Sequence, residues 1–244
     1  MRIENCIAVV TGANRGLGKA YVDALLAAGA AKVYAGARDL ASVRTTSERV
    51  VPLRLDVTQE HQVLAAAERC ADVTLLINNA GIMKSCPMLA DGSEGVLRAE
   101  MEVNVFGVLR MVRAFAPVLA KNGGGAIVNM LSVVSWFVNP SNATYCASKY
   151  AALAVTDAVR FQLKSQGTQV VAVHAGYIDT DMAAGVDSPK VSAQQVAERT
   201  LDGVREGRNS VRADQRSEEV WQKLKTDPEG LYARLQELWD GRKA

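Results

Sequence analysis

The chain has 244 residues, of which 28 are Lys or Arg and 26 are Asp or Glu, so its formal net charge is +2. This small charge, with the basic residues scattered along the chain, argues against a nucleic-acid partner. A hydrophobic content of 49% and a charged content of 22% are typical of a folded protein with a substantial core, and we expect a single domain over residues 1–244.

No targeting or membrane segment is expected. The N-terminus leads directly into a short apolar strand, without a long apolar stretch followed by a small-residue cleavage site. We find no apolar run of roughly 18 residues, the length that spans a bilayer. Cys6, Cys70, Cys86 and Cys146 are widely spaced, as free thiols in a reducing compartment would be, so we expect a cytoplasmic protein. Two histidines are too few for a histidine-rich zinc site, and no metal is expected.

Short β-branched runs alternate with stretches of helical periodicity along nearly the whole chain. Strands are expected at Cys6 to Val10, Lys32 to Ala35, Val50 to Leu55, Thr74 to Asn78, Ala126 to Met130, Gln169 to His174 and Asn209 to Ala213. Helices are expected to begin near Leu17, Leu40, Gln59, Gly95, Thr144 and Ser192. This alternation predicts an α/β fold, a Rossmann-type doubly wound parallel sheet of about seven strands with helices on both faces.

A glycine-rich turn follows the first strand and opens the first helix. Its glycines permit a tight turn and a close approach of the backbone to a pyrophosphate, and the free N–H groups of the helix start attract anions. The alternative is that the glycines serve only the turn and helix packing. We expect the dinucleotide to contact Gly12, Asn14, Gly16, Leu17 and Gly18.

The end of the second strand indicates which dinucleotide is preferred. An acidic residue about twenty positions after the last glycine would bind the adenosine ribose of NAD, but Ala37 and Arg38 stand there. A guanidinium can grip a 2′-phosphate with paired charge-assisted hydrogen bonds, and Arg15 in the glycine turn could reach the same phosphate. The two cations favour NADPH/NADP+, although Asp39 could weaken the preference and Arg38 alone could be a solvated surface charge.

Tyr145 and Lys149 lie one helical turn apart, and Ser132 lies upstream of them. Residues at i and i+4 share a helix face, so the Lys149 ammonium is expected near the Tyr145 hydroxyl, where it would lower the pKa of the phenol. Such a tyrosine can act as a general acid. The Tyr-x-x-x-Lys pattern alone is weak evidence, because it also occurs by chance on surface helices.

Several further motifs follow in a fixed order. They are Leu55-Asp56-Val57, Asn78-Asn79-Ala80-Gly81, Asn104, Ser132 and Gly176-Tyr177-Ile178-Asp179-Thr180. With the glycine turn and the Tyr145/Lys149 pair, they resemble the classical short-chain dehydrogenase/reductase family over about Cys6 to Val211. A joint occurrence of these motifs by chance is negligible.

The resemblance implies additional cofactor contacts. Asp56 would contact the adenine amino group with Val57 packed near the base, unless Asp56 is only a strand-end cap, and Thr180 would bind the nicotinamide carboxamide. The residues that the resemblance assigns to the cofactor are Asp56, Val57, Asn79, Ala80, Gly81, Tyr145, Lys149, Gly176, Ile178 and Thr180. Where the family usually has Pro-Gly, this chain has Ala175 before Gly176, so a looser nicotinamide loop is expected.

The resemblance also implies a catalytic mechanism. Ser132 and Tyr145 would hold a carbonyl oxygen, and Tyr145 would donate the proton. Lys149 would bind the nicotinamide ribose, and Asn104 would hold a water that connects Lys149 to solvent, unless Asn104 is an ordinary polar helix residue. The expected activity is NADPH-dependent reduction of a ketone or aldehyde; an oxidative alcohol or hydroxysteroid dehydrogenase and a noncatalytic NADPH sensor are the alternatives.

Apolar side chains near these motifs predict a small hydrophobic carbonyl or alcohol as substrate. The expected pocket residues are Met83, Trp136, Phe137, Val138, Tyr177 and Met182, and an ordinary core role is their alternative. No cationic cluster indicates an acyl-carrier protein or a coenzyme A tail. From about residue 214 we expect a C-terminal helical extension that packs on the domain, reaches a partner subunit or covers the site. By analogy with the family we expect a homodimer or homotetramer.

Overall fold

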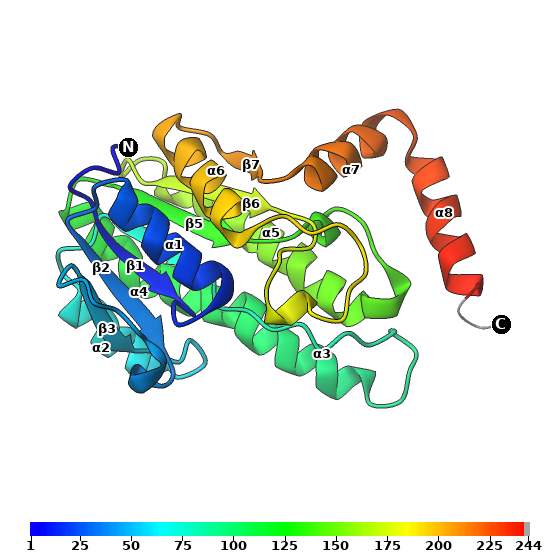
Figure 1. The fold of residues 1–244 in the computed structure, drawn as a ribbon, viewed down its shortest axis with the longest axis horizontal. Helices are drawn as coiled ribbons and strands as arrows, with labels where there is room; N and C mark the ends of the chain where they lie inside the picture. Colours follow the sequence, from blue (N-terminus) through cyan, green and yellow to red (C-terminus); the bar gives the residue numbers. More distant parts are fainter. Residues whose placement is uncertain (242–244) are drawn as a thin grey trace.

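The structure is a computed structural model, and it describes residues 1–241. Seven parallel strands form one sheet in the order β3-β2-β1-β4-β5-β6-β7. The strands are β1 (Ile7–Thr11), β2 (Lys32–Ala37), β3 (Val50–Arg54), β4 (Leu75–Asn78), β5 (Ala126–Met130), β6 (Gln169–His174) and β7 (Ser210–Arg212). The predicted doubly wound sheet is therefore confirmed (Figure 1).

Eight α-helices accompany the sheet within the described residues. They are α1 (Gly16–Ala27), α2 (Glu60–Arg69), α3 (Ser93–Met101), α4 (Val108–Lys121), α5 (Ala143–Leu163), α6 (Ala193–Arg205), α7 (Gln215–Thr226) and α8 (Pro228–Asp240). A π-helical segment, Glu102–Gly107, joins α3 to α4, so the two form one continuous rod.

The helix expected to begin near Leu40 does not form. A short 3-10 turn, Leu40–Ser42, stands in its place, and the Asp39 side chain caps it by accepting a hydrogen bond from the Ala41 N–H at 3.0 Å. The next residues are rich in Ser and Thr, whose hydroxyls compete for backbone groups and so favour turns over helix. Thr45 shows this directly, because its hydroxyl accepts from the backbone N–H of Ser47.

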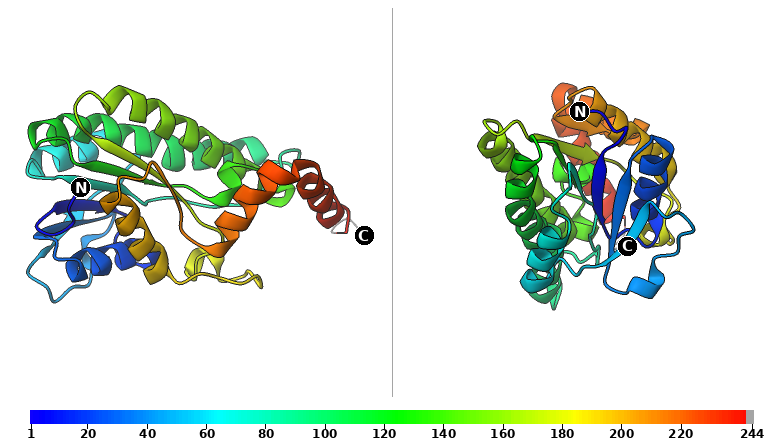
Figure 2. Two further views of the ribbon diagram at one scale, coloured as in Figure 1. Left: turned by 90° about the horizontal axis from the view of Figure 1, so that it is seen from above. Right: turned by 90° about the vertical axis from the view of Figure 1, so that its left-hand side faces the viewer.

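Alternate side chains of each strand enter two separate hydrophobic layers, as expected for a sheet covered on both faces. Ala8 and Val10 of β1 face the layer formed with α1 and α6. Val9 faces the opposite layer, formed with α2, α4 and α5. Figure 2 shows the two sets of helices on opposite sides of the sheet.

The rod formed by α3 and α4 differs from the expectation that the chain has no apolar run long enough to cross a bilayer. Among the described residues, the helix Ser93–Lys121 is long and apolar enough to do so by length and composition. The side chains of Met111, Phe115 and Leu119 are, however, fully buried beneath the sheet. A core helix meets the same criterion, and these contacts account for its apolar composition.

The sheet order reverses between β1 and β4, and open α/β sheets bind ligands at such a switch point, beyond the carboxyl ends of the strands. The glycine turn follows β1, and residues 79–81 follow β4. Ser132 follows β5, and Gly176 follows β6. Because all seven strands are parallel, these segments meet at one edge of the sheet.

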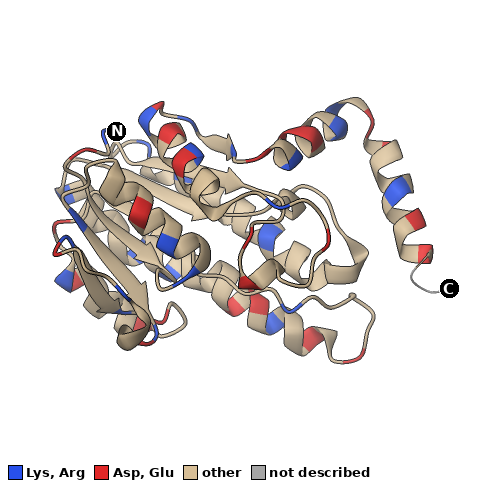
Figure 3. Ribbon diagram, viewed as in Figure 1, with Lys and Arg blue, Asp and Glu red and all other residues tan. Residues whose placement is uncertain are grey.

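The chain after β7 forms the expected helical extension. Asp214 caps α7, since its carboxylate accepts from the Ser217 N–H at 2.7 Å. In Figures 1 and 2, α7 leads away from β7 and α8 projects at the end of the molecule. Acidic and basic side chains are interspersed over the ribbon, and both kinds occur on α7 and α8 (Figure 3).

Candidate active site

The glycine turn forms a cradle with no room for side chains. Gly12 has φ +64, in the left-handed region that favours glycine. A Cβ at Gly18 would lie 1.9 Å from the Gly12 carbonyl oxygen. The N-cap residue of α1, Arg15, makes no side-chain capping hydrogen bond, so the N–H groups of this helix start can receive an anion. This cradle fits the pyrophosphate of a dinucleotide.

Hydrogen bonds tie the glycine turn to the segment after β4. The Asn79 side-chain amide donates to the carbonyl oxygen of Thr11 at 2.9 Å. In return, the Thr11 hydroxyl accepts from the backbone N–H groups of Asn79 and Ala80 at 3.0 and 2.9 Å. Thr11 was not among the predicted site residues, yet it sets the spacing between the two loops that flank the switch point.

The adenosine end partly differs from expectation. Arg38 is exposed, and the Asp39 carboxylate caps the following turn. Arg15, by contrast, forms an ion pair in which its guanidinium nitrogen lies 2.7 Å from a carboxylate oxygen of Asp181. The Arg15 side chain is 69% exposed and the Asp181 side chain 76% exposed. The pairing follows from the close approach of two loops, because a Cβ at Gly16 would lie 3.2 Å from Thr180 Cγ2. Arg15 therefore lies toward the loop after β6 rather than beside Arg38.

Asp56 and Val57 lie in the turn between β3 and α2. The Asp56 carboxylate accepts from the Thr58 N–H at 3.0 Å and from the Thr58 hydroxyl at 2.8 Å, which is a local capping arrangement. Val57 is buried in the hydrophobic layer and packs on Gly107, where a Cβ would lie 2.7 Å from a Val57 methyl group. Val57 is thus a core residue, and Asp56 also has the strand-end role that we considered as its alternative.

Tyr145, Lys149 and Asn104 come together with Gly81 at the sheet edge. Lys149 is only 6% exposed, and its Nζ lies 5.6 Å from the centre of the Tyr145 ring. A Cβ at Gly81 would lie 3.8 Å from this Nζ and 3.1 Å from Asn104 Oδ1. Because Gly81 has no side chain, space is left directly beside the Lys149 ammonium and the Asn104 side-chain oxygen.

The expected lowering of the Tyr145 pKa by Lys149 is not what the structure shows. Burial raises the pKa of the Tyr145 phenol well above its ordinary value, and the hydrogen bond with Ser132 opposes only part of that rise. Burial also lowers the pKa of Lys149 to about 8. Lys149 donates one of its N–H groups to the Met130 carbonyl oxygen at 2.9 Å, which leaves its other N–H groups for further partners.

Asn104 lies in the π-helical segment, a wider turn that often occurs at functional sites. Its side-chain amide donates to the Ile82 carbonyl oxygen at 2.9 Å and to the Ser148 hydroxyl at 3.0 Å. Its side-chain oxygen accepts from the Ile82 N–H at 2.9 Å. These bonds fix the loop after Gly81 against α5. The water-holding role implied by the resemblance stays a prediction.

Ser132 is buried at the end of β5, where its hydroxyl caps the 3-10 turn Val133–Ser135. Beneath it lies His174, which sequence reasoning did not single out. Its Nδ1 is 3.0 Å from the Ser135 hydroxyl and 3.3 Å from the Ser132 carbonyl oxygen. Burial lowers the pKa of His174 to about 4, so a neutral imidazole supports the serine loop.

The loop after β6 is braced from two sides. The Gly176 N–H donates to the Asp214 carboxylate at 2.7 Å. The Val191 N–H donates to the Tyr177 carbonyl oxygen, and the Asp179 N–H donates to the Val191 carbonyl oxygen, both at 2.9 Å. Asp214 was missed because its partner lies far away in sequence. These bonds hold the loop that lacks the usual proline, and they also place Ile178 and Thr180.

The expected substrate residues differ in their exposure. Phe137, at 4% exposure, belongs to a hydrophobic cluster with Val220 of α7 and Leu231 of α8. Trp136 stacks on His174 with ring centroids 3.9 Å apart. The remaining predicted pocket residues, Met83, Val138, Tyr177 and Met182, are half-buried or exposed around the site. The packing of α7 and α8 explains why Phe137 is covered.

A glycine cradle at the switch point of a parallel sheet, beside grouped Ser132, Tyr145 and Lys149 side chains, defines a nucleotide-dependent oxidoreductase. Among residues 1–241, no group of three or more His, Cys, Asp or Glu side chains is placed to hold a metal ion. The family described as short chain dehydrogenase matches residues 6–190. The protein therefore belongs to the short-chain dehydrogenase/reductase family and is an NAD(P)-dependent oxidoreductase.

Individual relatives agree with this assignment. A short chain dehydrogenase of Monascus purpureus is 32% identical over 212 residues, which cover 77% of this chain and 73% of the relative. The 3-oxoacyl-(acyl-carrier-protein) reductase of Thermotoga maritima is 33% identical over 193 residues, covering 75% and 78% of the two chains. A crystal structure of a short chain dehydrogenase from Burkholderia cenocepacia in complex with NADP is 44% identical, with a TM-score of 0.93 and 96% and 99% of the two chains covered.

Proposed function

We propose that this protein reduces hydrophobic ketones or aldehydes with NADPH. The observation that carries the proposal is the placement of the Tyr145 hydroxyl, which is hydrogen-bonded with Ser132 and lies beside Lys149. The phenol of Tyr145 and the hydroxyl of Ser132 can each donate one hydrogen bond to the same carbonyl oxygen. The pair therefore supports reduction, in which negative charge develops on that oxygen.

The side chains divide the work as follows. Held by the glycine turn and Lys149, a reduced nicotinamide would supply the hydride for the carbonyl carbon. Ser132 stabilises the developing charge on the oxygen, and Tyr145 gives that oxygen its proton. Lys149, with a pKa of about 8, is largely protonated at neutral pH and stabilises the phenolate that remains. Asn104 keeps the loop after Gly81 in place through its bonds to Ile82.

Two features support NADPH over NADH. Arg38 is exposed at the end of β2, while the neighbouring Asp39 carboxylate caps a turn and is thereby drawn away from a ribose hydroxyl. The Burkholderia cenocepacia relative, 44% identical, was crystallised with NADP. The ion pair of Arg15 with Asp181 is exposed, and exposed pairs contribute at most about 1 kcal/mol, so Arg15 can exchange this partner for a phosphate.

Cofactor kinetics test this preference. We expect a higher kcat/KM for NADPH than for NADH on a panel of hydrophobic ketones. Arg38→Gln should lower kcat/KM for NADPH by about tenfold, because one charge-assisted contact is lost, and should leave that for NADH nearly unchanged. Arg199→Gln, an exposed substitution on α6, serves as the control. Equal use of the two cofactors by the wild type would contradict the preference.

We also propose a reducing compartment and a homo-oligomeric assembly for this enzyme. All four cysteines are free thiols, which supports a reducing compartment such as the cytoplasm. A homo-oligomer is proposed from the exposed aromatic side chains of Phe106, Tyr150 and Phe161, which lie on the π segment between α3 and α4 and on α5.

A further inference from the structure

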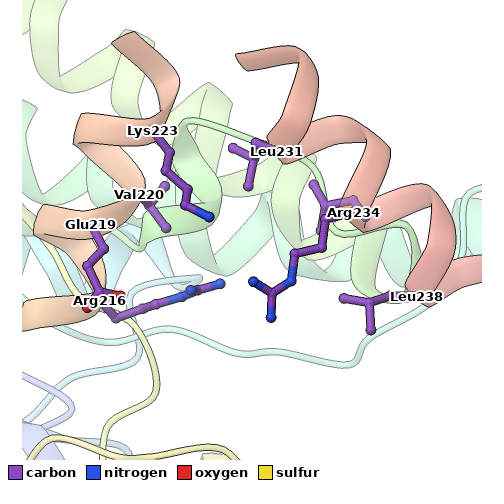
Figure 4. A pocket seen from close by; sticks show the side chains of 8 residues that line it. Arg216, Glu219, Val220, Lys223, Leu231, Arg234 and Leu238 are labelled. Carbon is purple, nitrogen blue, oxygen red and sulfur yellow. The ribbon is translucent and has the colours of Figure 1, made fainter. Parts of the chain in front are cut away.

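Three basic side chains converge on a cavity between α7 and α8. The cavity has a volume of about 160 Å³ and is lined by Arg216, Glu219, Val220, Lys223, Leu231, Arg234, Leu235 and Leu238. In Figure 4, the guanidinium groups of Arg216 and Arg234 point toward each other from the two helices, and the Lys223 ammonium extends between the same helices. Like charges that converge in this way would repel each other unless an anion lies between them.

The three cations are not neutralised by neighbouring acids. Among residues 1–241, no ion pair is formed by Arg216, Lys223 or Arg234. The acidic residue at the cavity is Glu219, and its carboxylate accepts a hydrogen bond from the Gln215 side-chain amide at 2.8 Å. The local charge of the four titratable lining residues is therefore positive, and their free N–H groups suit a carboxylate or phosphate.

The cavity borders two structural parts of the active site. Arg216 packs on the loop over the nicotinamide, because a Cβ at Gly176 would lie 2.9 Å from Arg216 Cγ. The floor residues Val220, Leu231 and Leu235 belong to the same hydrophobic cluster as Tyr145. One wall of the cavity thus lies against the loop after β6, and its apolar floor packs in the cluster that also contains Tyr145.

We infer that this cavity binds the anionic end of the carbonyl substrate, so that the natural substrate is an oxo acid with an apolar segment between its ketone and its acid group. Arg216 and Arg234 hold the acid group from opposite sides, Lys223 adds a third positive charge, and the leucine and valine side chains line the apolar segment. This inference rests on the proposed reduction of carbonyl compounds at Tyr145. The proposed substrate class thereby changes from hydrophobic carbonyl compounds in general to carbonyl compounds that also carry an acid group.

Matched substrates test the inference. Straight-chain oxo acids, with the ketone at increasing distance from the carboxylate, are compared with their methyl esters at saturating NADPH. We expect the wild type to prefer one of the acids over its ester by about tenfold in kcat/KM, mainly through a lower KM, as two charge-assisted contacts would give. The preference should decline as the ionic strength rises, because the cations are exposed and screened by salt.

Three single variants locate the effect. Arg216→Gln and Arg234→Gln should each raise the KM for the preferred acid about threefold to tenfold more than the KM for its ester. Arg199→Gln on α6 should retain the acid preference. Two results would overturn this inference while leaving the proposed carbonyl reduction intact. One is an equal kcat/KM for acids and esters in the wild type. The other is a loss of acid preference in Arg199→Gln as large as in the two cavity variants. Failure to reduce any acid or ester would contradict the proposed function, and this inference with it.

Discussion

Burial governs the protonation state of three side chains around the site. It raises the pKa of Tyr145, lowers that of Lys149 to about 8 and lowers that of His174 to about 4. The first two shifts oppose the simple picture in which the lysine acidifies the tyrosine, because desolvation disfavours both the phenolate and the ammonium. At neutral pH the site holds a neutral phenol and a neutral imidazole, the forms needed for proton donation and for structural support.

His174 makes a specific contribution to the pH dependence of stability. Its pKa is lowered in the folded protein from 6.5 to about 4, so the unfolded chain binds more protons between these values. The contribution of His174 to the free energy of unfolding is therefore fully present above about pH 6.5 and is lost as the pH falls toward 4. Between pH 7 and 5, the wild type should lose about 2 kcal/mol more of its free energy of unfolding than His174→Gln. Urea denaturation at the two pH values measures this difference, and equal losses would contradict the neutral buried state of His174.

Residue identities in the site could be predicted where a local spacing carries them. Tyr145 and Lys149 are one helical turn apart, and the structure brings them together with Asn104. The roles of Asp214 and Phe137 could not be predicted, because each depends on contacts that the fold makes over long sequence separations. Asp214 holds the Gly176 N–H, and Phe137 is covered by residues from α7 and α8.

At the scale of single elements, the glycine turn after β1 has the strictest steric requirement. Gly18→Ala would place a methyl group 1.9 Å from the Gly12 carbonyl oxygen, so the turn must shift. We expect a loss of about 1–3 kcal/mol in the free energy of unfolding and at least tenfold weaker binding of NADPH, measured by denaturation and by fluorescence titration.

Gly95→Ala is the matched control for that substitution. Gly95 is exposed on α3, and an added Cβ would meet nothing within 4 Å. Alanine there should be neutral or add up to about 1 kcal/mol of stability, because it favours helix over glycine. If both variants bound NADPH like the wild type, the close approach of the turn to the cofactor would be refuted.

Elements with a regular pattern were predicted well, and those shaped by side-chain competition were not. All seven strands form near their expected positions, because short apolar runs rich in β-branched residues mark them. The helix near Leu40 was lost to the Ser and Thr residues of the following turn. The cationic cavity could not be predicted from the sequence. Arg216 and Arg234 belong to different helices, and their side chains meet only because α7 and α8 face each other.

At the scale of the whole molecule, exposed aromatic side chains point to self-association. Phe161 on α5 is 78% exposed, and water contact with such a side chain is unfavourable. We expect light scattering to give two or four times the chain mass of 26.1 kDa. Phe161→Asp should reduce the measured mass, because the charge would be buried in the interface.

Leu64→Asp is the control for Phe161→Asp in the light-scattering measurement. Leu64 lies on α2 and is 51% exposed, and α2 is not among the helices expected at the interface. This variant should keep the wild-type mass. A monomeric wild type, or the same decrease in mass for both variants, would be inconsistent with an interface at α5.

The central claim is that Tyr145 donates the proton during NADPH-dependent carbonyl reduction, and the most direct measurement compares Tyr145→Phe with the wild type. Both proteins are titrated with NADPH and then assayed on the best ketone of the panel at saturating cofactor. We expect the same NADPH affinity within a factor of about three and a kcat at least about a hundredfold lower in the variant, since general acid catalysis contributes roughly 10²–10⁴-fold. Wild-type turnover by Tyr145→Phe, with normal NADPH binding, would contradict the mechanism.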